Sequence, residues 1–371
     1  MQLMPKKPPI DVPGEGFDPQ KVENLPAGKL NPAVFKRIKK HGSPSALSLA
    51  QKIKAGDMVS LAQGITLVES NKAEDRISAK ELITECISSN NSAVRIGISG
   101  SPGVGKSSFI EAIGLLLAEK NHKVAVLAID PSSSITGGSI LGDKTRMQQL
   151  STHNNAFIRP SPAGKTLGGV ARYTRETIIL CEAAGFDTII IETVGVGQSE
   201  IMVESMVDLF VLLIQPGAGD ELQGIKRGVV EMADIVIVNK ADGDKLHAVK
   251  QAQAAYFQAL HLFPAKSHSQ EVPVMTCSST ELIGIEEAWV AMMKLLDYFK
   301  ANSYFNQRRE AQVLYWFHES IKNNILDVFN QYPSVKADIS SLENDIVQHK
   351  ISPFDAADIV LNKFFEILKS K

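Results

Sequence analysis

The chain has 371 residues, of which 44% are hydrophobic and 22% charged, values typical of a globular protein with two or three compact units. Lysine and arginine total 39 and aspartate and glutamate total 41, so the formal net charge is −2. This balance argues against a nucleic-acid-binding protein held by a basic surface. No apolar run approaches the roughly 18 residues of a membrane span, which argues against a membrane protein.

The first residues, MQLMPKKPPI, have neither the apolar core of a signal peptide nor the Arg-rich pattern of a transit segment, so we expect a cytoplasmic protein. Residues 1–32 contain seven of the 17 prolines. Proline suppresses helices and central strands, so we predict an extended arm there, with a disordered tail as the alternative. The three cysteines, Cys86, Cys181 and Cys277, are too far apart to indicate a disulfide framework or a Cys-rich zinc site.

Residues 33–90 are predicted to form an N-terminal helical region, in which Asp57 caps a helix that carries Met58, Leu61 and Ile65 at helical spacing. Residues 285–371 are predicted to be helical again. Their apolar stripe, which includes Phe317, packs on its own domain or forms a dimer interface.

Between these helical regions, residues 91–284 alternate short β-branched runs with helical stretches. The runs are continuously hydrophobic, which indicates strands buried on both faces of a parallel sheet. The fold class predicted is therefore α/β with a mostly parallel central sheet and helical extensions at both ends. The strands are expected at 94–99, 123–130, 156–160, 188–193, 209–215, 234–240 and 272–278.

The strongest motif is GSPGVGKS at 100–107, which matches G-x-x-x-x-G-K-[ST] between a predicted strand and a predicted helix. Its glycines let backbone N–H groups turn around phosphate oxygens at a helix N-terminus. Lys106 would bridge the β- and γ-phosphates, and the Ser107 hydroxyl would bind Mg²⁺. The residues assigned to phosphate binding are Gly100, Ser101, Pro102, Gly103, Val104, Gly105, Lys106, Ser107 and Ser108.

A second motif, NKAD at 239–242, follows the strand expected at 234–240 and fits N-K-x-D, the sequence with which GTPases recognise guanine. The Asp242 carboxylate can accept hydrogen bonds from the guanine ring N–H and amino group, whereas adenine presents the wrong donors. Asn239 and Lys240 complete this motif. Cys277, Ser278 and Ser279 follow the last strand, where either a second base-contacting loop or a plain polar turn would lie.

Three acidic residues are candidates for binding metal or for positioning water. Glu192 lies at the end of the strand, bounded here at 188–192, so its carboxylate would lie beside the phosphate loop, and a capping or structural role is the alternative. Asp130 and Asp143 would supply further hard oxygen ligands, or would serve as turn and cap residues. The Gly-rich stretch 215–227 is either a mobile switch or a strand-to-helix loop.

These motifs, in this order, resemble the MeaB/MMAA/ArgK family of P-loop GTPases across roughly residues 35–371. The shared stretches are LAQGITLVES (61–70), GISGSPGVGKSSFIEAIG (97–114), VLAIDPSSSITGGSILGDKTRM (126–147), FIRPSP (157–162), LGGVA (167–171), GFDTIIIETVGVGQSE (185–200), PGAGDELQGIKRG (216–228), ADIVIVNKAD (233–242) and VPVMTCSS (272–279).

The resemblance implies a GTPase that acts as a chaperone of an adenosylcobalamin-dependent acyl-CoA mutase, chiefly methylmalonyl-CoA mutase, gating its cofactor loading and protecting or reactivating it. It implies a homodimer joined by C-terminal helices, a switch at 216–228, and a Mg²⁺ site at Ser107, Asp130, Asp143 and Glu192. Lys106, Glu192 and Asp143 would take part in hydrolysis of GTP to GDP.

No stimulating arginine can be assigned from the sequence, where Arg146, Arg172 and Arg175 are the candidates, so intrinsic turnover is expected to be slow. The alternative function is a phosphotransferase linked to an arginine/ornithine transport system, as older naming of some family members has it. A metal-insertion GTPase would call for Cys/His clusters, which the scattered cysteines do not provide.

Overall fold

The computed structural model describes residues 45–70, 72–87, 92–129, 147–161, 167–193, 199–217, 227–264 and 266–369. The predicted arm at 1–32 therefore lies outside the described residues. By backbone contacts residues 45–371 form a single unit. No described helix is both long enough and apolar enough to cross a membrane.

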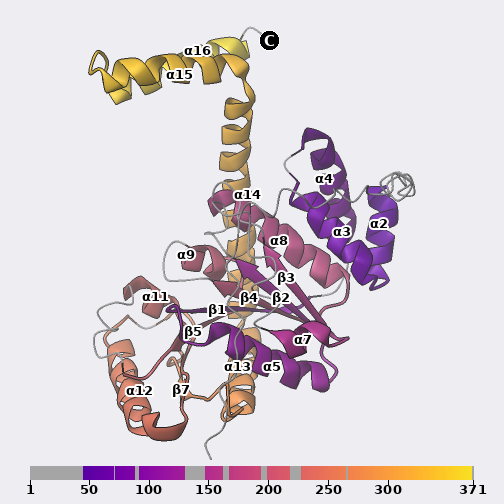
Figure 1. Cartoon of the computed structure of the whole chain (residues 1–371), viewed down its shortest axis with the longest axis vertical. Helices are drawn as coiled ribbons and strands as arrows, with labels where there is room; N and C mark the ends of the chain where they lie inside the picture. The colour runs from indigo at the N-terminus through magenta and orange to yellow at the C-terminus, as the bar shows by residue number, and fades with distance from the viewer. Residues whose placement is uncertain are drawn as a thin grey trace, which may run out of the picture. The chain divides into compact units, whose positions relative to one another are not determined.

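One seven-stranded sheet carries the fold, in the order β3-β2-β4-β1-β5-β6-β7, and every neighbouring pair is parallel (Figure 1). The parallel α/β architecture predicted from the β-branched runs is confirmed. The strands are β1 (Val94–Gly100), β2 (Val124–Ile129), β3 (Ala156–Ser161), β4 (Thr188–Thr193), β5 (Leu209–Ile214), β6 (Ile235–Val238) and β7 (Val274–Thr276).

The last two strands end earlier than the sequence pattern predicts. β6 stops at Val238, because Lys240 has a φ of +61°, which no strand residue adopts. β7 stops at Thr276. The polar residues 239–240 and 277–278 therefore form loops at the edge of the sheet and do not extend its strands.

Helices pack on both faces of the sheet, because successive strand residues point to opposite sides. In β4, Ile189 and Ile191 belong to one buried cluster and Ile190 to the other. The helices are α2 (Ala46–Lys54), α3 (Met58–Val68), α4 (Ala73–Ile87), α5 (Lys106–Glu119), α7 (Gln148–Thr152), α8 (Leu167–Ala183), α9 (Ser199–Glu204), α11 (Arg227–Met232), η3 (Gly243–Lys245), α12 (Leu246–Leu260), α13 (Ile285–Ala301), α14 (Tyr304–Gln331), α15 (Pro333–Val347) and α16 (Pro353–Lys369).

The N-terminal helices α2, α3 and α4 contact one another and α8, so they cover part of one face. Asp57 caps α3 as predicted, accepting a hydrogen bond from the Ser60 amide at 2.9 Å. Helices α5 and α13 contact each other and contribute to the buried cluster on the opposite face.

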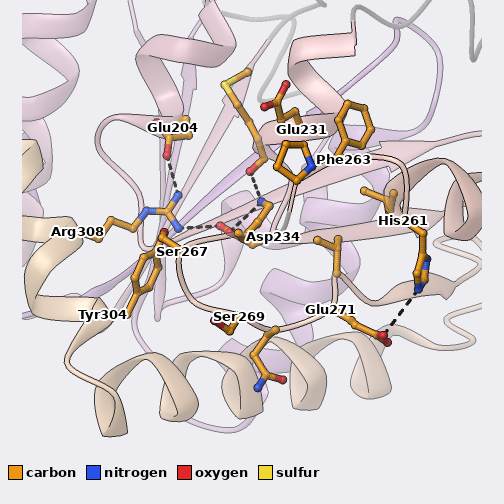
Figure 2. A pocket seen from close by; sticks show the side chains of 16 residues that line it. Glu204, Glu231, Asp234, His261, Phe263, Ser267, Ser269, Glu271, Tyr304 and Arg308 are labelled. Carbon is orange, nitrogen blue, oxygen red and sulfur yellow. Dashed lines mark hydrogen bonds and ion pairs between the residues drawn. The ribbon is translucent and has the colours of Figure 1, made fainter.

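Helix α14 is attached to the sheet through buried ion pairs at the edge where the strands begin. Figure 2 shows the Arg308 guanidinium between the carboxylates of Glu204 and Asp234, with N–O distances of 3.1 and 2.8 Å. These residues line a cavity of about 470 Å³. Burial alone would raise the pKa of Asp234, but Arg308 and Lys266 outweigh it, and the pKa lies below its usual value. The carboxylate is therefore ionised and depends on its cationic partners.

We expect Arg308→Met to lower the free energy of unfolding by about 3 kcal/mol or more, because it leaves a buried carboxylate without its main partner. Urea denaturation at pH 7 measures this change. Lys322→Met is the control on the same helix, because Lys322 pairs with Glu319 through a largely exposed side chain and its loss should change little. Equal effects of the two substitutions would contradict the importance assigned to the buried pair.

Candidate functional site

The phosphate loop joins the central strand β1 to helix α5, and all of residues 100–108 are described. Gly105 precedes the helix with a φ of +95°, and a Cβ at this position would lie 2.6 Å from Nδ2 of Asn239. Only glycine satisfies both constraints. The Lys106 side chain is buried, and its Nζ donates to the carbonyl oxygens of Gly100 and Ser101 at 2.7 and 3.1 Å. The Lys106 ammonium is thus held by carbonyl groups of the phosphate loop itself.

Ser107, in the first turn of α5, and Glu192, near the end of β4, come together beside the phosphate loop. Glu192 lies on β4 beside Ile98 of β1, and its Oε1 accepts a hydrogen bond from the Ser107 hydroxyl at 3.1 Å. The Glu192 residue is 7% exposed. A hydroxyl and a buried carboxylate in contact beside a phosphate loop are the hard oxygen ligands that Mg²⁺ takes together with phosphates and water. The two residues present therefore fit a magnesium ion.

The other two acidic candidates, Asp130 and Asp143, lie outside the described residues. Strand β2 ends at Ile129, the residue before Asp130, and β2 neighbours β4 in the sheet. Among the described residues, no group of three or more His, Cys, Asp or Glu side chains has the arrangement of a metal site.

The amide of Asn239 connects three loops at the carboxyl edge of the sheet. Its Nδ2 donates to the carbonyl of Val104 at 2.9 Å, which ties it to the phosphate loop. Its Oδ1 accepts from the backbone N–H and the hydroxyl of Ser279, at 3.2 and 2.9 Å, and from the thiol of Cys277 at 3.4 Å. Burial raises the pKa of Cys277 to about 12, so the thiol stays protonated and donates.

The residues 277–279 and 239–242 thus form one joined loop pair. The Ser278 hydroxyl donates to Oδ2 of Asp242 at 2.5 Å, and the Ala241 amide donates to the carbonyl of Cys277 at 2.9 Å. One carboxylate oxygen of Asp242 is therefore held in place. The residues 277–279 are therefore joined to the NKAD loop, and their contact with a base stays a prediction.

Lys240 makes a contact that the sequence analysis did not foresee. Its Nζ donates to the carbonyl of Gly103 at 2.6 Å and to Oε1 of Gln215 at 3.1 Å. Gln215 directly follows β5 and precedes the Gly-rich stretch 216–228, whose residues 218–226 are outside the described part. The left-handed φ of Lys240, unusual for a residue with a side chain, accompanies this contact. The one sequence feature that could have indicated this contact is Gln215, a long polar residue at the end of a strand that neighbours β1.

The two candidate arginines that the structure describes, Arg172 and Arg175, have their partners elsewhere. Arg172 pairs with Glu176 on its own helix at 3.0 Å. Arg175 donates to the carbonyl of Gln312 and lies near Arg95, at the edge where the strands begin. Arg146 is outside the described residues. The structure therefore gives neither Arg172 nor Arg175 a role at the phosphate loop.

The parallel sheet, the loop after its central strand and the paired loops after β6 and β7 are together those of a P-loop nucleotide-binding protein. Residues 61–334 match the model of the family described as "Methylmalonyl Co-A mutase-associated GTPase MeaB". The chain belongs to this family and is a P-loop GTPase.

Known proteins agree with this assignment. The chain is 44% identical over 319 residues to the mouse protein named "Methylmalonic aciduria type A homolog, mitochondrial", covering 83% of this chain and 77% of the relative. It is 43% identical over 277 residues to "GTPase ArgK" of Escherichia coli, covering 75% and 84% of the two chains. A crystal structure of a protein named "LAO/AO transport system kinase" superposes with a TM-score of 0.67 at 32% identity, covering 87% of this chain and 98% of that one.

We expect Asp242→Asn to weaken binding of GDP by about a hundred-fold or more. The substitution replaces a carboxylate, which can accept hydrogen bonds from both guanine donors, by a carboxamide whose NH2 group cannot accept one. Titration with a fluorescent guanine nucleotide measures the loss, and binding of the xanthine nucleotide should improve. Asp244→Asn is the matched control, since Asp244 is exposed two residues further along. A similar loss in both variants would show that Asp242 does not read the base.

Proposed function

We propose that this GTPase is a chaperone of an adenosylcobalamin-dependent acyl-CoA mutase, with methylmalonyl-CoA mutase as its partner. GTP binding and hydrolysis gate loading of the mutase cofactor and protect or reactivate the mutase. The observation that carries the proposal is the family match, whose description names a mutase-associated GTPase and which includes the whole candidate site. The name of the mouse relative, which refers to methylmalonic aciduria, supports the same partner.

In the proposed mechanism, the phosphates of GTP lie in the loop at 100–108. Lys106 Nζ then exchanges at least part of its bonds with the Gly100 and Ser101 carbonyls for the β- and γ-phosphate oxygens. Asp242 binds the guanine, and Asn239 keeps the base loop attached to the phosphate loop. Glu192 and Asp143 orient the attacking water.

Ser107 and Glu192 are the described residues that would hold Mg²⁺, with Asp130 and Asp143 as further proposed ligands. The bound ion would neutralise charge that develops on the transferring phosphoryl group. Each of these ligands is a hard oxygen group, in keeping with magnesium rather than with a softer metal.

Turnover of the isolated protein should be slow, because Arg172 and Arg175 are engaged elsewhere. Switch GTPases that lack a supplied arginine hydrolyse GTP at about 10⁻⁴ to 10⁻³ per second. A partner that completes the site would raise this rate. The mutase is the partner proposed to do so.

The second candidate function is a phosphotransferase, favoured by the similarity to the crystal structure of a protein named as a transport system kinase. Such an enzyme would transfer the γ-phosphate to an acceptor side chain. It would leave labelled phosphate on protein, whereas a GTPase releases all of it to water.

We expect GTP turnover to rise at least ten-fold on titration with methylmalonyl-CoA mutase, with ATP remaining a poor substrate. Release of ³²P from γ-labelled GTP, with gel analysis of protein-bound label, measures both candidate functions. Lys106→Ala should abolish turnover in either case. A rate indifferent to the mutase would remove the proposed partner, and label retained on protein would favour the phosphotransferase.

We also propose that the protein is a homodimer joined through the C-terminal helices. Gln312 and Trp316 of α14 are buried and donate to the carbonyls of Val207 and Ser205, whereas Phe317, Ile321 and Ile325 are 59%, 42% and 59% exposed. Helical spacing places these three on the side of α14 opposite to Gln312 and Trp316. A row of exposed large apolar residues supports an interface between copies.

Phe317→Glu combined with Ile325→Glu should convert the dimer to a monomer, because two carboxylates would be buried against the partner. Light scattering coupled to size-exclusion chromatography gives the mass directly. Asn330→Glu, which adds a charge at an exposed position on the opposite side of α14, should leave the mass unchanged. A wild-type protein that is already monomeric would refute the dimer.

Cytoplasmic location stays a prediction.

A further inference from the structure

A cavity of about 280 Å³ lies between α4, α8 and α14, at the edge of the sheet where the strands begin. It lies at the opposite end of β1 from the phosphate loop, since Arg95 at the start of that strand lines it. Its walls combine three arginines with aliphatic side chains. The lining residues that matter most are Arg95, Arg175, Arg309, Glu182, Ile178 and Gln312.

Two of the three arginines are already neutralised. Arg95 binds Glu182 through Nε and Nη2, with distances of 3.0 and 2.8 Å to one carboxylate oxygen. Arg309 binds Asp208 through Nε and Nη2, at 2.8 and 2.7 Å. Each nearby carboxylate therefore has a guanidinium of its own.

Arg175 is the third arginine and has no carboxylate within ion-pair distance among the described residues. Its guanidinium donates to the carbonyl of Gln312 at 3.3 Å and lies 5.4 Å from the centre of the Trp316 ring. Burial and the charge of Arg95 lower its pKa to about 10, and Glu182 offsets this only in part. At neutral pH the group is charged, so the cavity carries one partly buried positive charge in excess.

The rest of the lining limits what can enter. Oε1 of Gln312 is buried without a hydrogen-bond partner in the described structure, so it can accept from a hydroxyl or from water. The Ile178 side chain is buried, with 1% of the residue exposed. Ile87, at the end of α4, also lines the cavity and is 63% exposed. The lining thus combines a guanidinium that has no carboxylate partner in the described part of the chain with the aliphatic side chains Ile87, Ile178, Ile179 and Val313, which matches a molecule with an anionic head and a short apolar body.

We propose that this cavity binds a small carboxylate with a short aliphatic chain. The carboxylate pairs with Arg175, and the chain packs against Ile178 and its aliphatic neighbours. This ligand supplies Arg175 with the carboxylate partner that no described residue provides. Its binding needs none of the groups that are proposed to contact the nucleotide. The proposal therefore does not rest on the proposed nucleotide mechanism.

Isothermal titration calorimetry of the full chain with acetate, butyrate and inorganic phosphate tests the site. We expect saturable binding that tightens from acetate to butyrate, with phosphate weaker than butyrate. Arg175→Gln should weaken butyrate binding by about ten-fold or more, because a hydrogen-bonded charge partner is lost. Arg172→Gln is the matched control: it removes an arginine from the same helix that pairs with Glu176 and does not line the cavity.

Ile87→Trp provides a second variant that leaves every charge in place. Ile87 is largely exposed, so the larger ring should be tolerated by the fold while it narrows the cavity and weakens butyrate binding. Circular dichroism confirms that each variant folds. Absence of saturable binding, or equal butyrate affinity in wild type, Arg175→Gln and Ile87→Trp, would overturn the site. Phosphate binding as tightly as butyrate would overturn the assignment of a carboxylate ligand.

Discussion

All seven strands run in the same direction, and the candidate nucleotide site depends on this constraint. Parallel strands place their carboxyl ends along one edge, so loops distant in the sequence meet there. The phosphate loop follows the central strand β1, Glu192 lies near the end of the neighbouring β4, and the base loops follow β6 and β7. The opposite edge holds the ion pairs that attach α14 to the sheet, so stability and nucleotide chemistry occupy different ends of the same strands.

Charged side chains have different kinds of partners at the two edges of the sheet. At the start of the strands, buried carboxylates such as Asp234 and Asp208 are paired with arginines of α14. At the carboxyl edge, Lys106 and Lys240 make their described contacts with backbone carbonyls and an amide, which are weaker partners for a cation. A phosphate bound in the loop is a stronger partner for Lys106 than a carbonyl oxygen, so it can join or displace these contacts.

Local sequence was sufficient to predict the seven strands, apart from the ends of β6 and β7, and the phosphate loop, because β-branched runs and the GSPGVGKS motif act over a few residues. The sequence predicted that Asn239 follows a strand but not its hydrogen bonds, because its partners Val104 and Ser279 are determined by the order of the strands in the sheet. The Lys240–Gln215 contact and the place of Arg175 beside the Gln312 carbonyl were not foreseen at all. Both contacts join segments that are distant in the sequence, so they depend on how the chain folds. Nothing in the local sequence around these residues indicates their partners.

The hydrogen bond between Asn239 and the Val104 carbonyl joins residues 135 positions apart. This bond requires β6 to be paired in the sheet through β5, because only then does Asn239 lie beside the loop that follows β1. A folding intermediate that contains only the first half of the sheet would have a phosphate loop without its brace. Guanine-nucleotide binding then reports completion of the fold, and during synthesis the site can mature only after β6 has joined the sheet.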